Sequence, residues 1–342
     1  MGRTLYRRPI AILYNDPYLL ENNQKTEAGA GDSLDAFVCA LQELKRPHKI
    51  IRIDRENSVE VVLALIEERY ELAINLCEDI GGNNLWEPNV PAVLELIGVE
   101  YTGSGPLALG LTCYKDRSKH LLKGAGLKTP GFFVTDQPME KAPIDFPLIV
   151  KPQHEDASIG IYHDSVVDDV ERLNQKIEYI REVLKQPSIV EQYIDGREFN
   201  VGLIGNPPEV LPIAEINFDG LPEGHAKICS YEAKWHYGSI FDQGTRPVFP
   251  DLPPKLKQNI TNAAVKAYEL FQCRDYARVD MRLDQRGTPY ILEVNCNPDI
   301  SPGAGFFRAF SLNGRNYADL VDLLVSFAEN RILTREPVRA IP

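Results

Sequence analysis

The chain has 342 residues, of which 44% are hydrophobic and 25% are charged, a composition typical of a globular protein rather than a disordered one. This length exceeds what one ordinary core accommodates, so it predicts two or three domains. The 37 basic and 49 acidic residues leave a net charge of −12, which argues against a nucleic acid as the main partner.

Six cysteines are scattered along the chain without the paired spacing of a zinc site or a disulfide framework. Reduced thiols in the cytoplasm are the expected state of such residues. The basic start of the chain is followed by an apolar run of strand length, too short for a signal peptide or a membrane span. We therefore expect a cytoplasmic protein without a membrane partner.

Strands and helices are predicted to alternate over roughly the first third of the chain. Short apolar runs predict the strands, and apolar residues three and four positions apart predict the helices. This alternation indicates an open, mostly parallel α/β sheet that binds ligands at the carboxyl ends of its strands, where the long loops 15–31 and 77–86 lie. The predicted strands are 9–14, 48–53, 71–76 and 99–102, and the predicted helices are 33–44, 59–70 and 87–98.

The next helical segment, 113–126, carries four basic residues: Lys115, Arg117, Lys119 and Lys123. A solvated helix face explains such a cluster as readily as phosphate binding does. Glycines 124 and 126 are the predicted helix stop.

A strand predicted at 146–152 contains Lys151 near its end, and a lysine at the end of a buried strand is costly unless an anion meets it. The loop 154–162 that follows consists of small and polar residues, whose backbone N–H groups can fold over phosphates. It is predicted to be either a lid over a ligand or a simple turn. A strand at 131–135 precedes this unit, and a helix at 167–184 covers it.

The strands 188–194 and 197–205 are predicted to form an antiparallel hairpin around the turn Asp195–Gly196. Glu191 and Glu198 lie on its two arms, where solvated edge charges are the ordinary explanation.

The last third of the chain begins with few core-type repeats. We expect a long loop at 217–247, which presents Lys234, and helices at 254–272 and 317–330.

The segment from Arg278 to Asn295 predicts a second hairpin, in which these two residues face each other and Asp280 faces Glu293. Two carboxylates directly opposite each other are unfavourable unless a cation lies between them. Mg²⁺ is commonly held by one or two carboxylates and substrate phosphates, so a magnesium site is predicted, with a solvated sheet face as the alternative. The other face is predicted to be core and comprises Val279, Met281, Leu283, Tyr290, Leu292 and Val294.

Six stretches of the chain resemble the ATP-grasp enzymes and, within them, the D-alanine–D-alanine ligases, in the order that this family has. They are LELIGVEYTGSGP, YKDRSKHLLKGAGL, PLIVKPQHEDASIG, VEQYIDGREF, SYEAKW and ARVDMRLDQRGTPYILEVNCNP. The resemblance implies an α/β, three-domain ATP-grasp fold, with an open parallel α/β domain at 1–106. A central lid domain at 107–190 and a C-terminal domain at 191–342, both α+β, would enclose ATP. It also implies a homodimer.

The resemblance implies a role for each matching residue. Three of them, Arg278, Lys234 and Lys151, would be catalytic, with Arg278 facing the acyl phosphate and Lys234 reaching the γ-phosphate. Two Mg²⁺ ions, with Mn²⁺ as an alternative, would be held by Asp280, Glu293 and Asn295. Contacts to ATP would come from Lys115, Lys151, Ser158, Glu191, Gln192, Tyr193, Ile194, Glu198 and Lys234, of which Glu191 to Ile194 would receive adenine and Glu198 the ribose.

The substrate half departs from the family's pattern. The family has a serine where this chain has Ala157 and a tyrosine where it has Trp235, and its N-terminal glutamate aligns only loosely with Glu27. The family's glycine and serine near the second substrate become Asp299 and Ala304, with Ser301 as a stand-in. Loss of a hydrogen-bonding hydroxyl from a buried site changes discrimination strongly. We therefore expect a retained ATP half and a rebuilt substrate half, in which Glu27, Trp235, Arg278, Asp299, Ser301 and Ala304 contact substrate.

These parts suit an ATP-dependent carboxylate–amine ligase that forms an acyl phosphate and joins an amino acid to a second acid or carbonyl compound. Three alternatives stay open. They are a genuine D-alanine–D-alanine ligase, a mycosporine-type ligase that condenses an amino acid with a ring ketone, and an ATP-binding module without catalysis.

Overall fold

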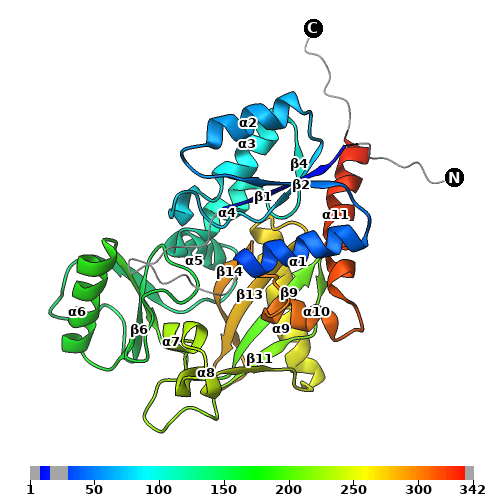
Figure 1. Ribbon diagram of the computed structural model, residues 1–342. Helices are drawn as coiled ribbons and strands as arrows, with labels where there is room; N and C mark the ends of the chain where they lie inside the picture. Colours follow the sequence, from blue (N-terminus) through cyan, green and yellow to red (C-terminus); the bar gives the residue numbers. More distant parts are fainter. Residues whose placement is uncertain (1–7, 16–29, 336–342) are drawn as a thin grey trace.

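The computed structural model describes residues 8–15 and 30–335, which form three β-sheets with helices packed on them (Figure 1). Glu27 lies outside the described residues. Within the described part of the chain, no helix is long and apolar enough to cross a bilayer. The mixed α/β class expected from the sequence is confirmed.

The N-terminal sheet is parallel, with strand order β2-β1-β3-β4. Along β1, Ile10 and Ile12 pack toward α1 and α11, whereas Ala11 and Leu13 pack toward α2 and α3. Both faces of the strand are therefore buried, as expected of a parallel sheet. The elements are β1 (Ile10–Tyr14), α1 (Ala30–Glu43), β2 (His48–Arg52), α2 (Ser58–Glu67), β3 (Leu72–Asn75), α3 (Asn89–Ile97) and β4 (Glu100–Tyr101).

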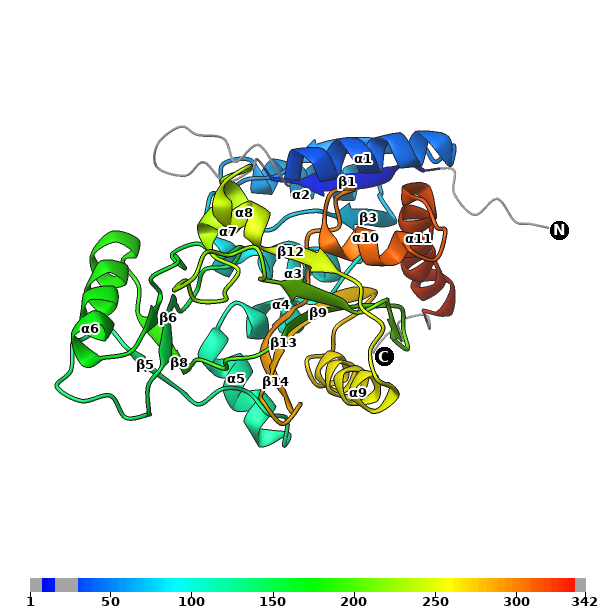
Figure 2. The same cartoon turned by 90° about the horizontal axis from the view of Figure 1, so that it is seen from below.

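The central sheet is antiparallel, with order β5-β8-β6-β7, and it forms a lobe that stands apart from the other two sheets (Figures 1 and 2). Leu148, Val150 and Val190 pack against α6, so Lys151 and Glu191 project from the opposite face. The elements are β5 (Phe132–Thr135), β6 (Leu148–Pro152), β7 (Val166–Val167), α6 (Val170–Tyr179), a π-helical turn (Ile180–Leu184) and β8 (Ser188–Gln192).

The C-terminal sheet has order β12-β11-β9-β13-β14, with β10 paired to β9. Helices α4, α5 and α9 cover one face, where Val279, Met281 and Val294 are buried. Helix α4 was not anticipated from the sequence. The elements are α4 (Pro106–Thr112), α5 (Lys115–Gly124), β9 (Glu198–Ile204), β10 (Glu209–Val210), β11 (Ala214–Asn217), β12 (Arg246–Val248), α9 (Pro254–Leu270), β13 (Tyr276–Leu283) and β14 (Pro289–Asn295).

The remaining helices are α7 (Tyr231–Trp235), α8 (Ile240–Gly244), α10 (Gly305–Ser311) and α11 (Tyr317–Thr334), besides a 3₁₀ turn at Asn84–Trp86. The first two lie within the segment expected to be a long loop, and Ser230 caps α7 by accepting a hydrogen bond from the Ala233 N–H. Helices α10 and α11 share a core with α1, which joins the two ends of the chain (Figure 2).

The hairpin predicted between β8 and β9 is wrong. β8 pairs with β5 and β6, whereas β9 pairs with β11 and β13, so the two strands belong to different sheets. An Asp-Gly pair suits a tight turn locally, but both strands already have partners on each side. The connection is instead a crossing from one sheet to the next.

The register of the β13–β14 hairpin is confirmed, with Arg278 paired to Asn295 and Asp280 to Glu293. Beyond Asp280 a β-bulge shifts the pairing by one residue. The predicted core face is therefore wrong at that end, because Ile291 is buried in place of Tyr290 and Leu292.

Candidate active site

A cavity of about 380 Å³ lies among loops that follow the strands of the N-terminal sheet, the loop after β6 and the β13–β14 hairpin. Helices α4, α5 and α7 and the loop after β14 complete its lining. Of the residues predicted as site residues, it brings together Lys115, Lys234, Trp235, Arg278, Glu293, Asn295, Asp299 and Ala304. Ala157, which stands where the family has a serine, also lines it.

The hairpin wall is dominated by Arg278. Its Nε and Nη2 donate to the two carboxylate oxygens of Asp280, both at 2.8 Å, and its Nη2 lies 3.9 Å from Glu293 Oε1. Desolvation raises the pKa of the Glu293 carboxyl, but the positive charges of Lys115 and Arg278, with those of other cations, outweigh it and lower the pKa. Glu293 is therefore ionised at neutral pH.

The donor set on this wall suits a hard cation. Glu293 and Asn295 line the cavity, and the Asn295 Oδ1 also accepts from the Asn297 N–H at 2.9 Å. Asp280 pairs with Glu293 in the strand register but does not line the cavity, and both its oxygens accept from Arg278. Among residues 8–15 and 30–335 no cluster of three or more His, Cys, Asp or Glu residues could hold a metal ion. Two carboxylates, one carboxamide and substrate phosphates form the kind of site in which Mg²⁺ is usually bound.

Two lysines reach the cavity from opposite sides. Lys115 begins α5 and its Nζ lies 2.8 Å from Asp156 Oδ1 on the lid loop. Burial lowers the pKa of Lys115, but the negative charges of Asp156 and Glu293 outweigh this and raise it. Lys234 enters from α7 and lines the same space.

Lys151 and Glu191 lie beside each other on the inner face of the central sheet, with Lys151 Nζ 3.2 Å from Glu191 Oε2. Neither residue lines the cavity, although the charge of Lys151 contributes to the lowered pKa of Glu293. A second ammonium, that of Lys119, lies 3.1 Å from the same Oε2. Burial lowers the pKa of Lys119 to about 8.

Glu198 is paired with Arg282, whose Nε and Nη2 lie 2.8 Å and 2.7 Å from Glu198 Oε2. Arg282 also donates to the Ile194 carbonyl at 3.0 Å, and its guanidinium lies 5.0 Å from the Tyr193 ring centroid. The β8–β9 crossing and the start of β9 are thus held to β13 by one buried arginine. Nothing in the sequence set Arg282 apart from other strand arginines.

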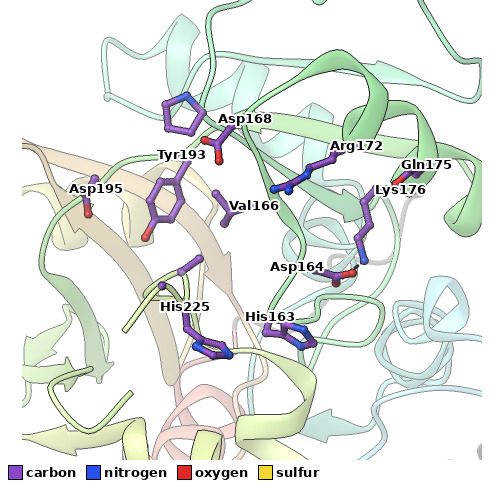
Figure 3. A pocket seen from close by; sticks show the side chains of 13 residues that line it. His163, Asp164, Val166, Asp168, Arg172, Gln175, Lys176, Tyr193, Asp195 and His225 are labelled. Carbon is purple, nitrogen blue, oxygen red and sulfur yellow. Dashed lines mark hydrogen bonds and ion pairs between the residues drawn. The ribbon is translucent and has the colours of Figure 1, made fainter. Parts of the chain in front are cut away.

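Tyr193 lines a different hollow, of about 670 Å³, between α6 and the segment 224–226 (Figure 3). His163 and His225 lie at one end of this hollow, and Lys176 forms an ion pair with Asp164 at its side. Gln192 donates its backbone N–H to the Gly131 carbonyl within the central sheet.

Two hydrogen bonds join the loop 154–162 to the segment around α7. Ser158 donates to the Cys229 carbonyl at 2.8 Å, and the Trp235 Nε1–H donates to the Ala157 carbonyl at 3.0 Å. Ala157 and Ser158 both have positive φ, at 52° and 63°. The Ser158 hydroxyl thus ties the loop 154–162 to the segment before α7 and does not line the cavity.

The far end of the cavity is acidic. Glu78 and Asp79 reach it from the loop after β3, and Asp299 faces them from the loop after β14. Desolvation, followed by the negative charges of Asp299 and Asp79, raises the pKa of Glu78 to about 7. Ser301 is buried outside the cavity lining. The sequence marks 77–86 as a long polar loop but does not single out its carboxylates.

Comparison with known proteins agrees with this architecture. A family model described as the D-ala D-ala ligase C-terminus matches residues 127–326, more than half of the chain. An uncharacterized protein of Sinorhizobium fredii, y4sG, is 35% identical over 88% of this chain and 88% of its own length. The D-alanine–D-alanine ligase of Bordetella petrii is 33% identical over 70% of this chain and 71% of its own.

Among solved structures, the D-alanine–D-alanine ligase of Bacillus anthracis complexed with ATP has a TM-score of 0.70 at 24% identity. The match covers 94% of this chain and 98% of that one, and at this identity it shows the fold. The family model and the relatives together show that the chain belongs to the D-alanine–D-alanine ligase family of ATP-grasp proteins, which are ATP-dependent ligases that form a C–N bond.

Proposed function

We propose that this protein activates a carboxylate by phosphoryl transfer from ATP and joins the resulting acyl phosphate to an amine, with a substrate pair other than two D-alanines. The observation that carries the proposal is the cavity in which Arg278, Glu293 and Asn295 meet Lys115 and Lys234. Phosphoryl transfer needs positioned cations around the moving charge, and Arg278, Lys115 and Lys234 supply them from β13, α5 and α7.

In this proposal Asp280, Glu293 and Asn295 would hold two Mg²⁺ ions, which Mn²⁺ could replace. The metal would neutralise negative charge during phosphoryl transfer. Lys115, Lys151 and Lys234 bind the phosphates of ATP, and Glu191 to Ile194 with Glu198 bind its nucleoside.

The proposed acyl phosphate faces Arg278, whose guanidinium stabilises charge as it develops on the oxygens. Its bond to Asp280 holds the guanidinium in one orientation and costs no reorganisation during the reaction. The amine is then bound at the end of the cavity that contains Glu78, Asp79 and Asp299, where an ammonium group is favoured.

The rebuilt acceptor site is supported by Trp235, whose indole lines the cavity while its N–H is committed to Ala157. A flat apolar wall suits an acceptor larger than alanine. We also propose the division into domains at 106/107 and 190/191, of which the middle segment holds the strands of the central sheet up to the middle of β8.

Phosphate release from ATP, measured against single amino acids and pairs with Mg²⁺, tests the function. We expect release to require a pair of which at least one member is not D-alanine. Rapid turnover with D-alanine alone would instead identify a genuine D-alanine–D-alanine ligase and contradict the rebuilt acceptor site. Release with a ring ketone as co-substrate would point to the mycosporine-type reaction.

Glu293→Gln tests the metal assignment. Removal of one ligand carboxylate is expected to lower kcat at least about a hundredfold and to raise the Mg²⁺ concentration needed for half-maximal rate. Glu209→Gln, an exposed glutamate on the short strand β10, is the matched control and should leave both quantities unchanged. Full activity of Glu293→Gln would show that the metal assignment to this wall is wrong.

A further inference from the structure

Lys119 is almost completely buried, with 1% of its surface exposed, although it lies on a helix whose other lysines reach solvent or the cavity. Its ammonium has three N–H donors and three acceptors around it. These are Glu191 Oε2 at 3.1 Å, the Leu292 carbonyl at 2.9 Å and Thr129 Oγ1 at 3.2 Å. The lysine is therefore fully satisfied and has no hydrogen left for a ligand.

Glu191 is equally buried, and its two oxygens have different surroundings. Oε2 is shared by Lys119 and Lys151, at 3.1 Å and 3.2 Å. Oε1 is buried and has no hydrogen-bond partner among the residues that the structure describes. A buried carboxylate oxygen without a hydrogen bond destabilises the protein. A ligand that donates a hydrogen bond to Oε1 removes this cost, and its binding is favoured accordingly.

The base of ATP carries such a donor, its exocyclic amino group. A purine with an oxo group in the same place brings an acceptor to Oε1 and leaves two oxygens facing each other. Discrimination between the two bases then depends on Glu191 staying ionised and keeping Oε2 turned toward the lysines. If a lysine charge is lost, the carboxyl is easier to protonate and can donate to the oxo group.

Lys119 and Lys151 hold Glu191 in different ways. Lys151 has 13% of its side chain exposed and lies on the strand that leads into the lid loop. Lys119 lies behind the carboxylate and also holds the Leu292 carbonyl, at the bulge that directly precedes Glu293. Through these contacts Lys119 joins the central sheet to the β14 wall of the cavity.

We propose that Lys119 is a positioning residue that fixes Glu191 for an amino-purine nucleotide and thereby sets the preference of the enzyme for ATP over ITP. This role rests on the proposed function, in which Glu191 receives the base. Lys119 itself touches neither the nucleotide nor the metal.

The test is calorimetric titration of the protein with ATP and with ITP, each in the presence of Mg²⁺. Wild type is expected to bind ATP more tightly. Lys119→Met should weaken ATP binding at least about tenfold and reduce the ATP-to-ITP ratio of affinities by a similar factor, whereas Lys119→Arg should retain most of the ratio. Lys123→Met, an exposed lysine one turn further along α5 whose Nζ lies 4.3 Å from the Phe132 ring centroid, is the matched control and should bind as wild type does.

A purely structural role for Lys119 would weaken both nucleotides equally, and that outcome, or an unchanged ratio, overturns the inference. If Lys119→Met does not fold, Thr129→Val provides the second variant, because it removes one acceptor from the ammonium and leaves every charge in place. It should lower the ratio by a smaller factor, and an unchanged ratio would again contradict the role. A wild type that binds neither nucleotide overturns the proposed function, whereas a wild type that binds ATP without preference overturns only the inference.

Discussion

The Glu191 carboxylate shows how a buried charge is stabilised residue by residue. Burial raises the pKa of Glu191, but the ammonium groups of Lys119 and Lys151 outweigh it and hold the pKa below its ordinary value of 4.5. As the pH falls below 4.5 an unfolded glutamate binds a proton while the folded one stays ionised. Acid therefore favours the unfolded state, and the stability contributed by this cluster is present above pH 4.5 and lost below it.

We expect the thermal unfolding midpoint of wild type to fall more steeply with decreasing pH than that of Glu191→Gln, in the range below 4.5. Glu191→Gln lowers the midpoint at every pH, because it leaves two buried ammonium groups without a counter-ion. The measurement is the difference between the unfolding midpoints of the two proteins as a function of pH. The contributions of the other carboxylates are the same in both proteins and cancel in this difference. Parallel profiles would show that the Glu191 pKa is the same in both states.

At this scale the sequence predicted the polar face of the β13–β14 hairpin, since strand alternation alone places Arg278, Asp280 and Glu293 together. It did not separate Lys119 from the other basic residues of α5. Helix periodicity says which side chains share a face, but it does not say that a second sheet will cover that face.

The β8–β9 crossing depends on Gly196, whose conformation is set by a close backbone approach. A Cβ at this position would lie 1.9 Å from the Leu283 carbonyl oxygen, and the Leu283 N–H donates to the Arg197 carbonyl at 2.9 Å. The crossing therefore rests directly on the end of β13. An added methyl group has to push the two sheets apart or break this contact.

Gly196→Ala is expected to destabilise the protein by at least about 2 kcal/mol and to raise the KM for ATP, because the crossing carries Tyr193 and Ile194. Gly110→Ala, within α4, is the matched control: its nearest neighbour is Pro88 at 3.8 Å, and alanine favours helix. Chemical denaturation and steady-state kinetics of both variants measure the two effects. Equal stability of the two variants would show that the backbone of the crossing can shift away from Leu283 at little cost in free energy.

Most of the longer helices and strands were predictable, whereas the short helices α4, α7 and α8 and two strand pairings were not. The alternating pattern identified the parallel sheet and the hairpin, but the Asp195–Gly196 turn suggested a hairpin between strands that belong to different sheets. Local turn chemistry does not report which strand edges are already occupied. The bulge after Asp280 was likewise invisible, because it changes the pairing of a strand without changing its composition.

A buried hydrogen-bond network around Asp275, whose side chain is fully buried, connects the N-terminal sheet to the C-terminal sheet and to α11. Arg331 of α11 donates to both Asp275 oxygens, at 2.6 Å and 3.0 Å, and to Glu100 Oε1 of β4 at 2.8 Å. The Gly103 N–H also donates to Asp275 at 2.9 Å. The N-terminal sheet, β13 and the last helix thus meet at one carboxylate.

Arg331→Met is expected to destabilise the protein by about 3 kcal/mol, because it leaves the Asp275 charge buried with fewer partners. Arg181→Met removes an exposed pair with Glu182 and should cost at most about 0.5 kcal/mol. Thermal unfolding of the two variants measures the contrast. Similar midpoints for both would mean that Gly103 and Asn206 suffice to stabilise Asp275.

The division of the cavity walls has a consequence for how the enzyme can change. In the proposed function, the β13–β14 hairpin, Lys115 and Lys234 line the part of the cavity that binds ATP. The loops that follow β3 and β14 line its acidic end. Those loops tolerate substitution better than strands do. In the proposed function, the acceptor can therefore change through a few substitutions in these loops while ATP binding is retained, and directed evolution toward a new acceptor should begin there.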